Sequence, residues 1–443
     1  MTARRTRHRR PAVLATFTLA LSLVLVACNS SSPSPTPSPS PSPTLALPSP
    51  SATPAPSEAP GASPSGEPSA ADPIYDEIEG EVAAMRGLEP TGPVDRRTID
   101  EAELKKQMEQ LYREETPPEL VAANERFYKA LDLLPADASL EDLTIEMLSG
   151  GVAGFYRDDQ KRLYVVSRSG GVGANEKITF AHEFNHALQD QHFPIFKEQE
   201  GVTNRTDWLM ARQAVYEGDS SLLMTLWASE NFTPAEFQEL LEQGLNDPSS
   251  QMLERMPAIL RETLLYPYTT GLSFVQGQYM GGGGWDAVDA LFDKVPETTE
   301  QVLHPDKYQA GEGPIAIELP DDLEDRIGPG WERTLDDTFG EFQTGVWLRD
   351  AGAENATEAA AGWGGDRVVV LEDGADNWAA ILATEWDSKA DADEFEASAG
   401  PVVDKLADPA ALLKGGTDTA RWVVVASSDD VLAAISQSLG LSD

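Results

Sequence analysis

The sequence predicts an α+β protein that is mainly helical. Three observations lead to this class. Apolar residues recur at helical spacing through most of the stretch between residues 98 and 292. One short stretch, between residues 150 and 167, has instead the composition of a strand pair. After residue 311, β-rich runs alternate with helical patterns, which predicts a small α/β unit over residues 311–443.

The charge balance limits the kinds of partner. The 443-residue chain has 33 basic and 74 acidic residues, and its formal net charge is -41. A surface of this charge repels phosphate backbones and anionic lipid headgroups. We therefore expect no nucleic-acid partner, and we interpret the acidity as a solvated exterior that keeps the protein soluble.

The first 28 residues have the form of a secretory leader. A basic start is followed by an apolar run from Ala12 to Ala27, which is too short for a comfortable membrane span. The small residues before Cys28 resemble a bacterial lipobox, and this resemblance implies cleavage ahead of Cys28 and attachment of lipid to it. Cys28 is the only cysteine, so we expect no disulfide. An uncleaved anchor is the alternative, and in both cases the folded part lies outside the cytoplasmic membrane.

The next segment, residues 29–72, predicts a tether. It consists almost entirely of Ser, Pro, Thr and Ala, so it cannot bury a core. Its alternating prolines favour an extended, stiff chain. We expect this tether to separate the folded part from the membrane.

Scaffold helices open the first folded domain, which we place at residues 73–310. A capping box at Thr98–Glu101 predicts the start of one helix, with Leu104, Met108 and Leu111 on one face. Pro117 and Pro118 end that helix and permit another. A third helix is predicted between Ser139 and Leu148.

A change of period follows these helices. Residues 152–156 and 162–167 predict two short strands joined by a polar turn. The loop at 169–174 then leads into a helix that we expect to begin at an Asn175 N-cap and to end before Pro194.

This helix carries the motif H-E-x-x-H, as His182-Glu183-Phe184-Asn185-His186. Histidines four residues apart lie on one helix face, where both imidazoles can bind a single metal ion, and the acid then lies near a bound water. The chain has five histidines in all, so chance is a poor explanation for the pattern. The alternative is that the two histidines only pack or cap the helix.

A catalytic zinc needs a third protein ligand. Glu217 is the favoured candidate, in a helix predicted from Thr206 to Ala228, where Gly218 permits close approach to the motif helix. His192 has the histidine spacing of the metzincins, but Gln189 stands where that family needs a glycine to turn the backbone. An acid elsewhere in the chain is the remaining alternative.

With Glu217 as the third ligand, residues 150–228 resemble the gluzincins, the thermolysin-like clan of zinc metallopeptidases. The resemblance covers less than a quarter of the chain, and it implies a zincin-like catalytic domain with a short β-sheet beside the metal-binding helix. It implies that His182, His186 and Glu217 bind Zn²⁺ and that Glu183 is the general base that activates a zinc-bound water. The strand edge beside such a site can pair with an extended peptide. More narrowly, the sequence around Gln189 and Glu217 resembles uncharacterised bacterial envelope lipoproteins grouped with the metallopeptidases.

Other residues are candidates for supporting roles. A tetrahedral oxyanion needs a donor besides zinc, and Tyr156, His304 and Tyr308 are the candidates, of which we favour His304 as a catalytic residue. Asp190 or Asp219 is a candidate to orient an imidazole from behind.

The C-terminal unit shows no cluster of histidine or cysteine in its sequence. Residues 367–371 and 378–383 predict paired strands around Asp373-Gly374, followed by a helix capped by Ser388, a third strand at 421–426 and a final helix. We expect this unit to support the catalytic domain.

Together these features predict a zinc metallopeptidase that hydrolyses peptide bonds of a peptide or protein substrate. The N-terminal lipid anchor would hold it on the outer face of the bacterial cell membrane. The alternative is a non-catalytic envelope lipoprotein that uses a degenerate metallopeptidase fold as a binding module.

Overall fold

The protein is described by a computed structural model over residues 15–19, 72–167, 170–199, 201–245 and 247–442. Cys28 and residues 29–71 of the predicted tether lie outside the described residues, as does most of the leader. None of the helices in the described part is both long and apolar enough to cross a membrane.

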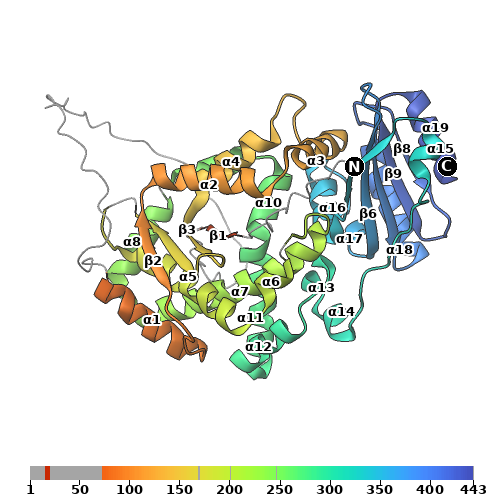
Figure 1. Cartoon of the computed structure of the whole chain (residues 1–443). Coiled ribbons are helices and arrows are strands. Elements are labelled where there is room, and N and C mark those ends of the chain that lie inside the picture. Colours follow the sequence, from red (N-terminus) through yellow and green to blue (C-terminus); the bar gives the residue numbers. More distant parts are fainter. Residues whose placement is uncertain (1–14, 20–71, 168–169, 200, 246, 443) are drawn as a thin grey trace, which may run out of the picture.

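The structure is a mixed α+β fold, as predicted, with a mainly helical part followed by a sheet-based C-terminal unit (Figure 1). In the helical part the helices are α1 (Asp72–Arg86), α2 (Glu101–Glu115), α3 (Pro118–Ala130), α4 (Leu140–Gly151), α5 (Ala174–His192), α6 (Ile195–Gln199), α7 (Thr206–Asn231), α8 (Pro234–Leu245), α9 (Pro248–Arg255), α10 (Ala258–Tyr266), η1 (Pro267–Gly271), α11 (Leu272–Gln278), η2 (Tyr279–Gly283), α12 (Trp285–Asp293), α13 (Thr299–Leu303) and α14 (Pro305–Ala310).

A four-stranded sheet lies beside the motif helix. Its strands are β1 (Ala15–Leu19), β2 (Asp95–Ile99), β3 (Val152–Arg157) and β4 (Arg162–Val166), in the order β1-β3-β4-β2. The predicted hairpin of β3 and β4 is confirmed as an antiparallel pair. The sequence analysis did not predict β2, which runs parallel to β4, or β1, which pairs antiparallel with the outer edge of β3.

The motif helix α5 is the centre of the helical part. It contacts β3 and β4 on one side and α7 and α1 on others, so all of its residues from Thr179 to Gln189 are buried. Apolar side chains of α1, α5 and α7 form one core with β3 and β4, in which the rings of Tyr75 and Phe180 stack at 4.2 Å. Burial on all sides means that the polar side chains of this helix, such as His182, Asn185 and Gln189, are buried together with its apolar ones.

The C-terminal unit is a five-stranded antiparallel sheet covered on both faces. The strands are β5 (Glu332–Asp337), β6 (Trp363–Glu372), β7 (Trp378–Trp386), β8 (Ala410–Lys414) and β9 (Ala420–Ala426), in the order β5-β6-β7-β9-β8. Its helices are α15 (Leu323–Ile327), α16 (Gly340–Asp350), α17 (Ala356–Ala360), α18 (Lys389–Val403) and α19 (Asp429–Leu439). The predicted pairing of β6 with β7 and the Ser388 N-cap are confirmed.

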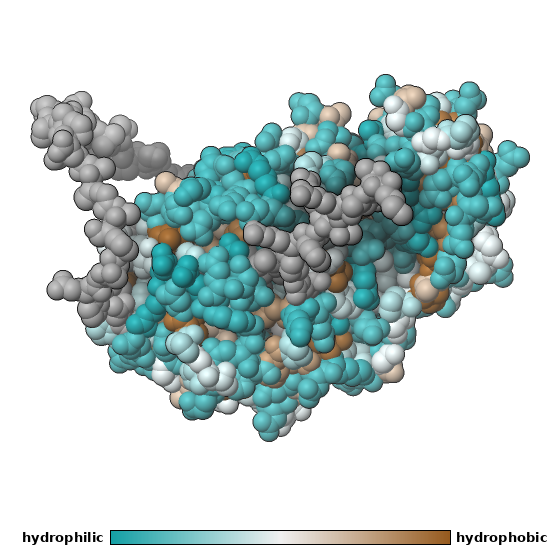
Figure 2. Space-filling model, viewed as in Figure 1, coloured by the Kyte–Doolittle hydropathy of each residue, from teal (hydrophilic) through white to brown (hydrophobic). Residues whose placement is uncertain are grey.

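The two parts share a hydrophobic core. Alternate residues of β6 and β7, such as Val368 and Leu382, face a cluster that continues into α3 and α10 of the helical part. The other face of the same strands packs against α19. Because apolar contacts run across the junction, the C-terminal unit supports the helical part. Hydrophilic residues cover most of the surface in Figure 2.

Two predicted helix starts are wrong by one or two residues. Thr98 does not cap α2, because its backbone pairs with Val165 in the sheet, and Asp100 accepts from the Glu103 backbone N–H instead. The motif helix begins at an N-cap on Gly173 rather than at Asn175. There the Glu176 carboxylate accepts from the backbone N–H of Gly173 at 2.9 Å.

Candidate metal centre

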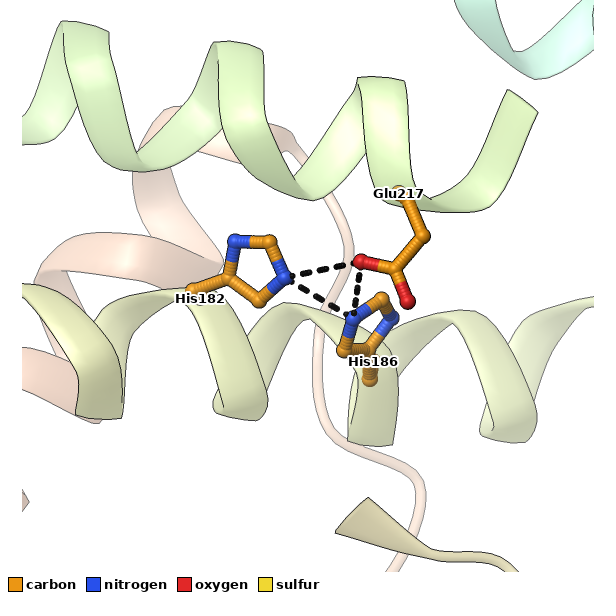
Figure 3. A group of neighbouring side chains, drawn as sticks. All are labelled: His182, His186 and Glu217. Atoms are coloured by element: carbon orange, nitrogen blue, oxygen red, sulfur yellow. Dashed lines mark hydrogen bonds and ion pairs between the residues drawn. The ribbon is translucent and has the colours of Figure 1, made fainter. Parts of the chain in front are cut away.

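Three side chains converge between α5 and α7. His182 and His186 project from α5 and Glu217 from the facing helix α7, as Figure 3 shows. The Nε2 atoms of the two imidazoles are 3.0 Å apart, and Oε2 of Glu217 lies 3.1 Å from Nε2 of His182 and 3.3 Å from Nε2 of His186. All three residues are buried. The structure thus brings together the residues that the sequence analysis selected.

The size of this triangle fits a bound zinc ion. Ligand atoms about 2.0 to 2.1 Å from zinc in tetrahedral geometry are separated by roughly 3.3 Å. The three observed separations of 3.0, 3.1 and 3.3 Å are close to this value. Two imidazoles and one carboxylate also form a common donor set of catalytic zinc, which keeps a fourth position for water or substrate.

The electrostatics of the cluster also favour a cation. Burial lowers the pKa of His182 to about 4, although the hydrogen bond that the ring donates to the Glu217 carboxylate acts to raise it. Burial lowers the pKa of His186 as well, but the Glu217 carboxylate outweighs burial and raises it to about 9. Burial raises the pKa of Glu217, and His186 and His182 together lower it to about 2. Without a metal ion, the protonated His186 ring supplies the positive charge beside the Glu217 carboxylate, and a metal ion bound there would replace this proton.

Close packing behind α7 fixes the position of Glu217. A Cβ atom on the adjacent Gly218 would lie 2.5 Å from the carbonyl oxygen of Gly271, and one on Gly271 would lie 2.5 Å from that of Ala214. Neither glycine therefore tolerates a side chain at this helix crossing. The contact of α7 with η1 confirms that Gly218 is at a site of close approach, although its partner is η1 and not the motif helix.

The C-terminal unit holds the beginning of α7. Asp337 of β5 accepts hydrogen bonds from the backbone N–H of Thr206 at 2.7 Å and from its hydroxyl at 2.6 Å. The backbone N–H of Asp207 donates to the Thr338 hydroxyl at 3.2 Å. The residue before the helix, Arg205, makes no side-chain cap. An acid from the C-terminal unit therefore caps the helix that carries Glu217, and its charge suits the positive end of the helix dipole.

Glu183 lies on the side of α5 that faces the sheet. It is fully buried, and a Cβ atom on Gly154 of β3 would be 3.0 Å from its Cγ atom and 2.6 Å from Cγ2 of Thr179. Strand and helix thus approach closely because residue 154 is glycine. On the outer edge of β3, Thr18 of β1 is paired with Gly154, so extended chain at this edge runs beside Glu183.

A cavity of about 340 Å³ opens beside Glu217. Its wall is mainly apolar and comes from α2, α3, α4, α10 and η1, with Leu260, Leu264 and Tyr268 among the lining residues. Tyr268 connects the cavity with the cluster, since its ring centroid is 6.3 Å from that of His182. Tyr268 is not among the site residues predicted from the sequence. Its position follows from the π-helical turn of η1, which has no clear sequence signal.

The other histidine candidates lie elsewhere. His192 ends α5 with an exposed ring, whose Nε2 contacts the backbone oxygen of Glu89 at 2.8 Å. His304 lies between α13 and α14, and its Nε2 is 2.8 Å from Oε1 of Glu341 in the C-terminal unit. Among the described residues, the group that includes His182 and His186 contains neither of them. The oxyanion role of His304 stays a prediction.

The remaining candidates for supporting roles have other partners. The Tyr156 hydroxyl donates to Asp190 at 2.6 Å, and Lys161 also pairs with Asp190 at 2.6 Å. Tyr308 donates to the backbone oxygen of Lys294 at 2.7 Å. Asp219 accepts from Gln189 at 2.8 Å, and Gln189 in turn contacts His186. Asp219, one of the two acids proposed to orient an imidazole, is thus linked to the cluster through Gln189. From the sequence, Gln189 was considered only because it stands where a metzincin needs glycine.

Comparisons with known proteins bear on the C-terminal unit alone. A family model described as a domain of unknown function (DUF8575) matches residues 327–437, which run from the end of α15 into α19. No curated protein and no solved structure matches the chain. The matched residues do not include His182, His186 or Glu217.

Proposed function

We propose that this protein is a zinc-dependent endopeptidase that acts outside the cytoplasmic membrane, to which lipid on Cys28 anchors it. The observation that carries the proposal is the convergence of His182, His186 and Glu217 within 3.3 Å of one another, with an acid beside the first histidine. The arrangement of α5 between a small sheet and α7 supports a zincin-like catalytic domain, and the glutamate ligand supports the gluzincin type.

The chain's own residues supply the proton transfers. When bound, zinc would supply a Lewis acid that polarises a peptide carbonyl and increases the acidity of water. Glu183 accepts the proton of the attacking water and delivers it to the leaving amine. The buried position of Glu183 next to Gly154 keeps its carboxyl group close to the edge of β3, where a peptide substrate would pair.

We take the outer edge of β3 as the binding site for a peptide substrate. Residues 15–19 pair with this edge as an antiparallel strand, with Phe17 opposite Phe155 and Thr18 opposite Gly154. Cleavage ahead of Cys28 would remove this segment and leave the edge available. An extended peptide that pairs there gains main-chain hydrogen bonds and passes beside Glu183.

The cavity beside Glu217 is suited to bind an apolar side chain of the substrate next to the scissile bond. Its volume of about 340 Å³ accommodates a large aliphatic or aromatic group. Apolar pockets with a few polar groups at the mouth are typical of ligand sites.

Two variants test the proposal. The wild-type protein, produced without residues 1–28, should contain one zinc per chain and cleave unstructured peptides. Glu183→Gln should retain zinc and lose hydrolysis, whereas Glu217→Ala should lose both. Unchanged zinc content in Glu217→Ala would refute the ligand assignment. If Glu183→Gln has no peptidase activity but keeps full biological function, the result would favour the non-catalytic binding module.

A further inference from the structure

The imidazole of His186 is held from both sides. Its Nε2 faces His182 and Glu217, while its Nδ1 lies 2.9 Å from Oε1 of Gln189. A histidine that binds a metal through Nε2 must carry its proton on Nδ1. The group that faces Nδ1 therefore decides whether the ring is ready for the metal.

The amide of Gln189 has only one orientation that satisfies its surroundings. Its Nε2 lies 2.9 Å from the carbonyl oxygen of Tyr216 and 2.8 Å from Oδ2 of Asp219. Both partners are acceptors, so the NH₂ group must face them and the oxygen must face His186. A reversed amide would place its oxygen against two other oxygens in a buried site, and this leaves several polar groups unsatisfied.

An ion pair keeps Asp219 in the accepting role. Nε of Arg86 donates to its Oδ1 at 2.9 Å, and both side chains are fully buried. The guanidinium also pairs with Asp289 at 2.7 Å and lies over the ring of Trp285 at 4.7 Å. Arg86 is the last residue of α1, so a helix that ends 96 residues before His182 takes part in this arrangement.

We propose that Gln189 is the positioning residue for His186 and that the Arg86–Asp219 pair sets the orientation of its amide. Arg86 holds Asp219, and Asp219 orients the amide of Gln189. This amide then fixes His186 as the Nδ1–H tautomer, with Nε2 directed at the proposed metal position. The role of this tautomer in zinc binding rests on the proposed function, whereas the tautomer itself does not. Gln189 thus has a positive role at the position where a metzincin would need glycine.

The first test measures the tautomer directly. In the metal-free protein labelled with ¹⁵N-histidine and measured at alkaline pH, where each imidazole carries a single proton, long-range ¹H–¹⁵N spectra distinguish Nδ1–H from Nε2–H rings. The chain has only five histidines to assign. We expect Nδ1–H for His186 in the wild type and a mixture of tautomers in Gln189→Met, a substitution of similar length with no donor and only a weak acceptor. An Nε2–H ring in the wild type, or an unchanged Nδ1–H ring in the variant, would overturn the proposal.

The second test measures zinc affinity by competition with a chelator. Gln189→Met should bind zinc about 10- to 100-fold more weakly, as is typical when a residue that orients a ligand is lost. Asp219→Asn should weaken binding in the same direction, because an amide at residue 219 permits both orientations of Gln189. It also provides the test if Gln189→Met does not fold. Affinity equal to the wild type in a folded variant would contradict the proposal.

Two matched controls separate positioning from packing. Asn185 donates to Asp219 at 3.2 Å and to Ser220 at 3.0 Å. These two bonds go to side chains of the network rather than to the His186 ring. The variant Asn185→Leu therefore disturbs the same buried network without removing a bond to the ring. Ser220 Oγ lies 3.3 Å from Nδ1 of His186 and is the competing partner. Both Asn185→Leu and Ser220→Ala should keep zinc affinity within about threefold of the wild type. A loss in either that equals the loss in Gln189→Met would overturn the proposal.

The proposed function and this inference can fail separately. A wild-type protein that binds no zinc refutes the proposed function, and the spectra of the metal-free protein still test the tautomer. A wild-type protein that binds zinc and hydrolyses peptides, with no change in Gln189→Met, refutes only the inference.

Discussion

Gly218 and Gly271 touch through their backbones where α7 crosses η1, and a Cβ atom on Gly218 would lie 2.5 Å from the Gly271 carbonyl oxygen and 2.7 Å from its carbonyl carbon. Both atoms belong to backbone, which cannot rotate away as a side chain can. The residue before Gly218 is Glu217, the proposed third ligand. The spacing of these two helical segments therefore determines where the carboxylate of Glu217 lies.

This contact predicts the effect of Gly218→Ala. The added methyl group forces α7 away from η1, and overpacking of this kind costs about 1 to 3 kcal/mol of unfolding free energy. Zinc affinity should fall as well, because the shift moves Glu217 from the two imidazoles. Denaturant unfolding and chelator competition measure the two effects. The control is Gly277→Ala in α11, where a Cβ meets nothing within 4 Å, so stability should be unchanged or slightly higher. Equal behaviour of the two variants would contradict the argument.

Much of the candidate site could be predicted from sequence because its signals are local. Histidine spacing on a helix, and a glutamate within a later helical stripe, are visible over a few turns of chain. The role of Arg86 had no such signal: its partner Asp219 is 133 residues away, and α1 itself was not predicted as a helix.

The same reason explains the two missed strands of the sheet beside α5. The strand β2 is a short polar segment whose assignment depends on parallel pairing with β4 across more than 60 residues. Pairing at that distance overrides local preference, which for Thr98 suggested a helix cap.

Asp207 predicts a dependence of stability on pH. Burial raises the pKa of this carboxyl to about 7, while hydrogen bonds from Thr299 oppose the shift and the nearby Asp366 and Glu341 add to it. Folded protein then keeps a proton that the unfolded chain releases near pH 4. The stability from Asp207 is therefore full below about pH 4 and is lost as the pH rises to about 7.

The variant Asp207→Asn should remove this dependence. An asparagine keeps an acceptor oxygen for Thr299 and carries no charge, so the variant and the wild type should be similar at pH 4. At pH 8 the variant should be more stable by roughly 1 to 4 kcal/mol, at about 1.4 kcal/mol for each unit of pKa shift. Denaturant unfolding at both pH values measures the difference. A difference that is the same at pH 4 and pH 8 would exclude Asp207 as its source.

If the protein is the proposed peptidase, the surroundings favour Tyr268 over His304 as the oxyanion donor. Tyr268 lines the cavity that Glu217 also lines and lies near the ring of His182, whereas the ring of His304 is paired with Glu341. Loss of one oxyanion donor lowers kcat by about 100-fold or more. We expect this loss in Tyr268→Phe, with zinc content unchanged, and nearly full kcat in His304→Gln. The reverse result would restore His304 as the donor.

The cavity beside Glu217 predicts a change of specificity in Leu264→Trp. Leu264 is a partly buried residue of α10 on the cavity wall, so an indole there fills space that a substrate side chain would use. For peptides with leucine or phenylalanine next to the scissile bond, kcat/KM should fall by about 10-fold or more. The reason is that the fit of one or two methylene groups in an apolar pocket changes kcat/KM by roughly 10- to 200-fold. Peptides with glycine or alanine at that position should be cleaved at nearly the wild-type rate. The control Leu241→Trp places the same ring on α8, where Leu241 is 40% exposed, and should change neither rate. An equal fall for large and small side chains would show that the substitution disturbs the metal centre rather than a specificity pocket.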